Sequence, residues 1–117
     1  MKAALIISHG SRSSKTKEEV AALLESLRKQ SQIPIWEYAF LEIEQPSIPV
    51  GIHLCVEKGA TEVFILLNFL NSGRHVDEDI PRIVREEQSR LPQVKIRLSK
   101  PVGQHPKITD LFLDLLK

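Results

Sequence analysis

Short apolar runs alternate with segments of helical spacing along the whole chain, and this alternation most constrains the fold. The apolar runs have strand length and cover Ala3–Ile7, Ile33–Phe40, Glu62–Leu67 and Val94–Leu98. Strands separated by helices are typical of βαβ units, which build parallel sheets with helices on their faces. The sequence therefore predicts an α/β fold, a three-layer sandwich with a four-stranded parallel sheet flanked by helices.

Four segments have the spacing of amphipathic helices, and capping residues mark several of their ends. These segments cover residues 16–30, 48–58, 80–91 and 108–116. Thr16 and Glu19 have the spacing of a capping box, and Ser47 and Gly59 are a predicted N-cap and helix stop. Pro81 suits a first helical turn, where its missing N–H is harmless.

The composition of each strand predicts its place in the sheet. The first and third strands are apolar throughout, as expected for central strands that are covered on both faces. The fourth alternates apolar residues with Lys95 and Arg97, and the second carries Glu37, so both are predicted edges. With right-handed crossovers the order becomes 2-1-3-4, which puts the first and third strands side by side at the switch point where ligands bind.

Length, charge and cysteine content exclude several classes of protein. A chain of 117 residues with 42% apolar residues is predicted to form one domain over residues 1–117. A net charge of +1 gives no indication of nucleic-acid or membrane binding. No apolar stretch approaches the roughly 20 residues of a membrane span, and we expect a cytoplasmic protein. The single cysteine, Cys55, excludes an internal disulfide and any cysteine-ligated cluster.

Two of the four histidines are predicted to meet at the switch point. His9 lies in the loop after the first strand, "SHGSRSS", and His75 lies in the loop after the third, "NFLNSGRH". Two imidazoles without a cysteine or carboxylate cage can bind a divalent first-row metal and leave coordination positions open. His105 also follows a strand, so it belongs either to the same rim or to a structural turn before Pro106. His53, inside a predicted helix, is interpreted as solvated or as a supporting residue.

Several motifs together resemble a known family. "SHGSR", "FLE" with "PSIP", "FLNSGRHVDEDIP" and "PVGQHP" are similar to the short class II chelatases that insert cobalt or iron into sirohydrochlorin. The resemblance runs nearly end to end and implies a chelatase-type, flavodoxin-like fold and a lyase of cobalamin or siroheme biosynthesis. It implies that His9 and His75 hold the metal and that Glu42 takes part as a ligand or proton acceptor. The metal is then a substrate, cobalt first with iron or nickel as alternatives, and no permanent cofactor is expected.

A carboxylate-fringed tetrapyrrole needs cations and N–H donors at its rim and an apolar wall against its ring. The candidate contacts near the two histidines are Ser11, Arg12, Phe69, Leu70, Gly73 and Arg74. Arg12 and Arg74 are candidate contacts for the carboxylates of the ring, although both could also be ordinary solvent-exposed residues. Phe69 and Leu70 suit the ring, although core packing explains Phe69 equally well. Gly10 and Gly73 permit a tight turn or a close approach of the backbone.

The absence of the second half that some relatives carry predicts a homodimer, with Leu41, Ile43 and Ile48 as candidate interface residues, although helix packing also explains Ile48. Two alternative functions remain open. One is a histidine phosphocarrier resembling the mannose-type phosphotransferase subunits, in which His9 would accept phosphate. The other is a non-catalytic carrier of metal or tetrapyrrole that uses the same histidines.

Overall fold

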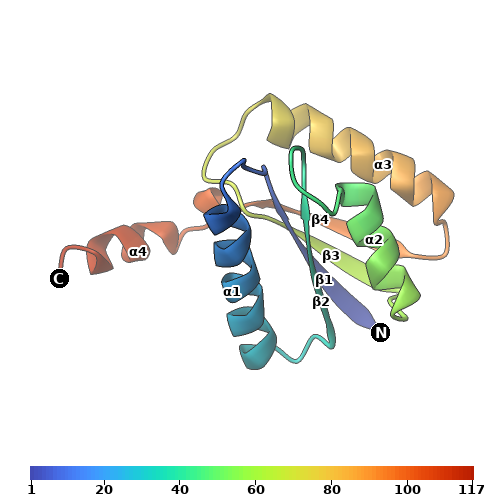
Figure 1. Ribbon diagram of the computed structural model, residues 1–117, viewed down its shortest axis with the longest axis horizontal. Coiled ribbons are helices and arrows are strands. Elements are labelled where there is room, and N and C mark those ends of the chain that lie inside the picture. The colour runs from blue at the N-terminus through green and yellow to red at the C-terminus, as the bar shows by residue number, and fades with distance from the viewer.

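The computed structural model describes residues 1–117 and contains one parallel sheet in the order β2-β1-β3-β4 (Figure 1). The strands are β1 (Lys2–Ser8), β2 (Ile35–Phe40), β3 (Glu62–Leu67) and β4 (Lys95–Pro101). The predicted α/β class, the strand order and the two edge strands are confirmed. Since β1 and β3 are neighbours, the chain does reverse its winding direction between them.

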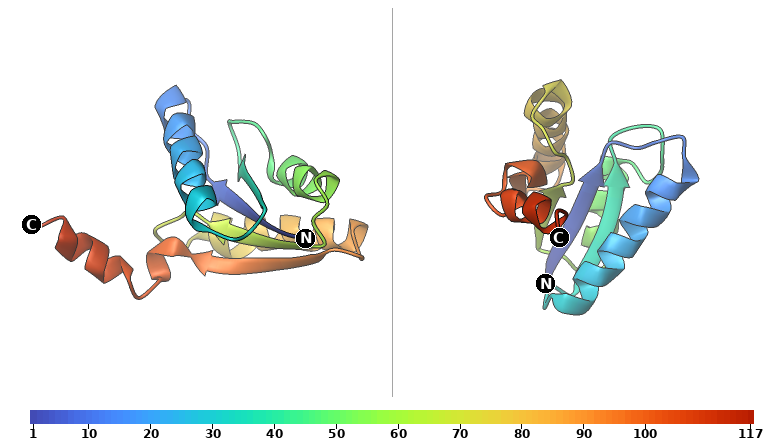
Figure 2. Two further views of the ribbon diagram at one scale, coloured as in Figure 1. Left: turned by 90° about the horizontal axis from the view of Figure 1, so that it is seen from below. Right: turned by 90° about the vertical axis from the view of Figure 1, so that its left-hand side faces the viewer.

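Helices cover both faces of the sheet, and the two faces are covered unequally. The helical segments are α1 (Ser14–Gln30), α2 (Ile48–Glu57), the π-helical turn η1 (His75–Asp79), α3 (Ile80–Arg90), the 3-10 turn η2 (Val102–Gln104) and α4 (Ile108–Asp114). The helices α2 and α3 pack beside each other on one face, whereas α1 lies on the other (Figures 1 and 2). The main hydrophobic core of 16 buried residues lies between the sheet and the α2–α3 layer.

The predicted apolar face of α2 is confirmed. Ile48, Ile52 and Cys55 are all buried, and the side chain of Ser47 accepts a hydrogen bond from the N–H of Val50 as an N-cap. At Gly51 a Cβ atom would lie 2.8 Å from the Cβ of Ala39 and 3.0 Å from a methyl group of Leu5. The helix therefore lies directly on β1 and β2, and any side chain at this position would push it away.

Two expectations about local structure are wrong. The capping box of Thr16 and Glu19 does not form, because α1 begins two residues earlier, with Ser13 at the N-cap position. Ile48 belongs to the core and not to an interface, since the first turn of α2 directs it at the sheet. Leu41 also packs against the core, so Ile43 is the one exposed member of the three proposed interface residues.

The helix after β3 begins earlier than Pro81 suggests. Winding starts at His75 as a π-helical turn, in which the N–H of Ile80 donates to the carbonyl oxygen of His75. Proline in a regular helix crowds the carbonyl group four residues back, and a wider turn ahead of Pro81 relieves that clash. The early start matters because it brings His75 onto a helical turn.

The last predicted helix forms, but it does not cover the sheet. Only Ile108 of α4 is partly buried, and the helix contacts little beyond η2. Figure 2 shows α4 projecting from the body of the molecule, whose longest principal dimension is 47 Å. No helix has both the length and the apolar character needed to cross a membrane.

Candidate metal centre

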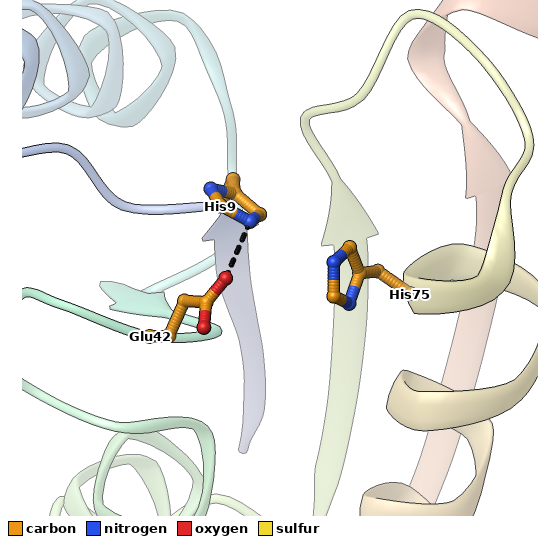
Figure 3. A group of neighbouring side chains, drawn as sticks. All are labelled: His9, Glu42 and His75. Carbon is orange, nitrogen blue, oxygen red and sulfur yellow. Dashed lines mark ion pairs between the residues drawn. The ribbon is translucent and has the colours of Figure 1, made fainter.

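Three side chains, each from the segment after a different strand, meet at the carboxyl edge of the sheet (Figure 3). His9 follows β1, Glu42 follows β2, and His75 is the first residue of η1 after β3. One nitrogen of each histidine and one carboxylate oxygen of Glu42 all lie within 4.8 Å of one another. The centroids of the two imidazole rings are 5.2 Å apart, so the predicted convergence of His9 and His75 is confirmed in geometry.

His9 and Glu42 are held together by the backbone as well as by their side chains. The Nε2 atom of His9 lies 2.7 Å from Oε1 of Glu42, and the N–H of Glu42 donates to the carbonyl oxygen of His9 at 3.0 Å. Gly10 has φ +107°, and a Cβ atom there would overlap the carbonyl oxygen of Glu42. Glycine is therefore required for the loop after β2 to approach the loop after β1 this closely.

His75 is oriented by a residue that sequence analysis missed. Its Nδ1 lies 2.9 Å from Oδ2 of Asp79, four residues later on the same helical turn. An imidazole whose Nδ1–H donates to a carboxylate presents the lone pair of Nε2 to a metal, with fixed tautomer and raised basicity. The signal was present in "HVDED", because residues four apart share one face of a helix.

The cluster is open to solvent. The side chains of His9, Glu42 and His75 are 44%, 50% and 49% exposed. Two imidazoles and one carboxylate suit several divalent first-row metals, and three protein ligands leave positions for water or a substrate. The arrangement can hold a metal ion while another molecule approaches it.

The residues expected to contact a substrate lie in two segments, one after His9 and one before His75. Ser11 and Arg12 line a cavity of about 630 Å³ at the start of α1, together with Ile43 of the loop after β2. The N–H of Ser11 donates to Oε1 of Glu44 at 2.8 Å, which ties this cavity to the same loop. Arg12 is an exposed residue of this lining and can bind an anionic group in the cavity.

Most of the candidate substrate contacts in the segment after β3 are exposed and do not pack in the hydrophobic core. Leu70 is 61% exposed and Arg74 is exposed beside Glu78, at 3.8 Å, whereas Phe69 packs against the core. Gly73 has an ordinary φ, and a Cβ atom there would meet nothing within 4 Å. No close approach therefore requires glycine at position 73, unlike position 10.

The other two histidines lie outside the cluster. The Nδ1 atom of His105 accepts a hydrogen bond from the N–H of Lys107 at 3.0 Å, which supports a structural turn. His53 on α2 lies 3.0 Å from Oε2 of the buried Glu87 on α3, whose other oxygen accepts from Arg90. His53 is therefore a supporting residue between two helices.

Together, the fold and the cluster define a three-layer α/β protein with an open histidine–carboxylate site at the switch point of its sheet. The model of the CbiX family matches residues 3–117, and the chain belongs to the CbiX family. The resemblance identified from the sequence motifs is confirmed, and the match favours a chelatase over a histidine phosphocarrier.

Several relatives are named as chelatases. The chain is 38% identical over 101 residues to the sirohydrochlorin ferrochelatase of Bacillus subtilis, covering 86% of this chain and 39% of that protein. It is 27% identical to the sirohydrochlorin cobaltochelatase of Methanocaldococcus jannaschii, covering 97% of this chain and 96% of the other. The sirohydrochlorin chelatase SirB of Bacillus subtilis subspecies spizizenii, solved in complex with cobalt, superposes with a TM-score of 0.89 at 32% identity.

The relatives differ in length. That superposition covers 98% of this chain and 49% of the SirB chain, and the chain spans half or less of the first three curated relatives that it matches. It spans nearly the whole of the Methanocaldococcus protein. The family therefore contains chains with room for one such unit and chains with room for two.

Proposed function

We propose that the chain is a sirohydrochlorin chelatase, a lyase-type enzyme that inserts a divalent metal ion into the tetrapyrrole in cobalamin or siroheme biosynthesis. The observation that carries this proposal is the group of His9, Glu42 and His75, whose ligand atoms lie within 4.8 Å of one another at the edge of the sheet. Membership of the CbiX family and the names of its relatives support the same substrate.

The reaction needs a site that binds metal and then gives it up. The macrocycle loses two pyrrole N–H protons and gains one divalent ion between its four ring nitrogens. Neutral imidazole nitrogens of His9 and His75 hold the ion at an exposed position, from which a ring can take it. Glu42, 2.7 Å from His9, completes the metal shell or accepts a proton as the ring binds the ion.

Several residues near the cluster in sequence suit the carboxylates of the substrate. Arg12 follows His9 by three residues and Arg74 directly precedes His75, both are exposed, and Ser11 lines the same cavity as Arg12. Guanidinium groups bind carboxylates through paired hydrogen bonds, which fits a ring fringed with carboxylates. Leu70, exposed after β3, offers apolar contact to the ring, while Phe69 packs against the core and anchors the loop that carries Leu70. Gly73 leaves open space before Arg74, into which an edge of the ring can fit.

The test is anaerobic incubation of the protein with excess sirohydrochlorin and Co²⁺, Fe²⁺ or Ni²⁺, followed by absorbance. We expect many turnovers per chain with at least one metal, cobalt first. Product that stops at one equivalent per chain would identify a non-catalytic carrier. Phosphorylation of His9 by a phosphocarrier protein, in the absence of metal, would identify the other alternative.

Substitutions connect that activity to the cluster. His75→Ala and His9→Ala each remove one ligand and should lower the insertion rate by at least about 100-fold. Glu42→Gln keeps the size of the side chain and should lower the rate while changing Co²⁺ affinity less. His53→Ala is the matched control, because His53 lies outside the cluster and the buried Glu87 keeps its contact with Arg90; this variant should leave the rate unchanged. Normal turnover in both histidine variants would contradict the assignment.

We also propose that two copies form the working unit. In a single copy His9, Glu42 and His75 are all about half exposed. A large planar ring bound against them would therefore stay open to water on its other side. SirB, in which this chain corresponds to 49% of the length, has room for a second unit in one polypeptide. A closed pair of identical chains is the commonest way to obtain the same arrangement.

A further inference from the structure

Ile43 has a backbone conformation that branched residues rarely adopt. Its φ is +72°, and it is the one residue other than glycine with a positive φ. The N–H of Glu44 donates to the carbonyl oxygen of Glu42 at 2.8 Å, so Ile43 is the central residue of a γ-turn of the rare, strained kind. Glycine or asparagine would adopt this conformation at a lower cost in free energy. The turn itself therefore does not explain why an isoleucine stands here.

The hydrophobic core does not explain it either. The side chain of Ile43 is 58% exposed and is not among the residues of the core. The turn is held from both sides by bonds that do not involve this side chain. The N–H of Glu42 donates to the carbonyl oxygen of His9 at 3.0 Å, and the carboxylate of Glu44 accepts from the N–H of Ser11 at 2.8 Å. Glycine between Glu42 and Glu44 would allow the same bonds.

An exposed apolar side chain on a strained backbone indicates a contact with another molecule. Strained residues persist where the surrounding structure holds them, and they are concentrated at binding and catalytic sites. In the free chain the strain at Ile43 lowers stability, and the half-exposed side chain recovers little of it through burial. The compensating contact is then one that forms only when a ligand or a partner is bound.

The surroundings of Ile43 indicate the chemistry of that molecule. Ile43 lines the cavity of about 630 Å³ at the start of α1, in which Ala21 is its one apolar neighbour. Arg12 and Lys17 are cations in the same lining. Binding sites for small molecules combine apolar surface with a few charged groups that fix orientation. An isoleucine beside two cations suits a ligand that carries carboxylates on an apolar frame.

The place of Ile43 in the chain connects it to the candidate metal site. Ile43 directly follows Glu42, whose carboxylate belongs to the cluster with His9 and His75. Consecutive Cα atoms are only about 3.8 Å apart. A tetrapyrrole is much wider than this distance, so a ring that lies over Glu42 also extends to Ile43.

We propose that Ile43 is a substrate-contacting residue, held in a strained turn so that its side chain packs against the tetrapyrrole beside Glu42. This proposal rests on the proposed function and adds a residue that binds the ring and does not bind the metal. Removing the side chain has two effects of opposite sign. The free chain becomes more stable because the strain is relieved, and the complex with the ring becomes weaker because the contact is lost.

Ile43→Asn separates these two effects, since asparagine accepts a positive φ and is polar. We expect the midpoint of urea unfolding to rise by about 0.5 M, and Ile43→Gly should raise it as well. Binding of metal-free sirohydrochlorin, measured anaerobically by its fluorescence, should weaken at least about 10-fold, as expected from the loss of one large apolar contact. The affinity for Co²⁺ alone, measured by competition with a chromophoric chelator, should change less than 2-fold.

Two further variants calibrate the effect. Ile43→Val shortens the side chain by one methylene group and keeps its branching, so it should weaken sirohydrochlorin binding by about 4-fold. Val50→Asn is the matched control, because Val50 is an exposed, branched apolar residue on α2 that is 48% exposed and does not line the cavity. This control should bind sirohydrochlorin as the unaltered chain does.

Each other outcome overturns the proposal. Unchanged sirohydrochlorin binding by Ile43→Asn would remove Ile43 from the contact and leave the chelatase assignment standing. Equal losses of Co²⁺ and sirohydrochlorin affinity would mean that Ile43 only positions Glu42. A lower molar mass of Ile43→Asn in light scattering would mean that Ile43 contacts a second copy. An unaltered chain that does not bind sirohydrochlorin would refute this proposal and the proposed function together.

Discussion

At the scale of single residues, the role of Asp79 is the sharpest new expectation. Asp79→Asn keeps the shape of the side chain but removes the charge that orients His75, and carboxylates behind metal-binding histidines typically contribute 10- to 100-fold in affinity. We expect Co²⁺ to bind about 10-fold more weakly, as measured by competition with a chromophoric chelator. Glu78→Gln is the control, since Glu78 is exposed and pairs only with Arg74. Equal effects of the two variants would argue against an orienting role.

Because Cys55 is buried, the free energy of unfolding should decrease as the pH rises above about 9. Burial, and secondarily the negative charge of Glu37, raises the pKa of this thiol from 9.0 to about 12. Above pH 9 the unfolded chain loses the proton while the folded chain keeps it, so the free energy of unfolding falls by up to about 1.4 kcal/mol per pH unit. Cys55→Ala should lack this part of the slope in urea titrations between pH 8 and 10.5. Identical slopes for both proteins would contradict the burial argument.

The candidate site was only partly predictable from single residues. The convergence of His9 and His75 follows from strand order, because both come after neighbouring parallel strands. Glu42 was indicated by family resemblance and by its place after β2 at the same edge of the sheet, but its contact with His9 depends on a loop whose path is set by contacts at Gly10. Asp79 was missed because the start of the helix was assigned too late, which hid its spacing from His75.

At the scale of elements, Gly10 and Gly73 near the cluster differ in whether the structure tolerates a side chain at their positions. Gly10→Ala places a Cβ atom against the carbonyl oxygen of Glu42 at φ +107°, and strain of this kind typically costs about 1–3 kcal/mol. We expect lower stability in urea unfolding and weaker Co²⁺ binding, since the loop that carries Glu42 must shift. Gly73→Ala, with open space around it, should be neutral or slightly stabilising. Tolerance of alanine at position 10 would show that the loop is free to move.

Element type was more predictable than element position. All four strands and the helices after them follow from periodicity, and β3 has the predicted bounds. The start of α3 was not readable, because a π-helical turn ahead of Pro81 has no signature in apolar spacing. The amphipathic pattern of α4 predicts a helix with an apolar face, and it carries no information about which molecule that face will contact.

At the scale of the whole molecule, strand order was predictable and layer coverage was not. The 2-1-3-4 order follows from which strands carry charge and from the hand of the crossovers. These rules place α1 alone on one face, but they do not say where a helix after the last strand will go. The radius of gyration is 14.3 Å, slightly above the roughly 13 Å of a compact chain of this length. The projecting helix α4 contributes to this larger radius.

The three segments of the cluster lie far apart in the chain, and this couples metal binding to folding. An unfolded chain cannot hold His9, Glu42 and His75 around one ion, so Co²⁺ should bind the native state almost exclusively. By mass action, a free metal concentration 100 times the dissociation constant would then add about 2.7 kcal/mol to the free energy of unfolding. Thermal unfolding should shift upward with Co²⁺ and return on addition of a chelator, whereas His75→Ala should show no shift. Heat resistance would thus report how much metal is available, before any tetrapyrrole is present.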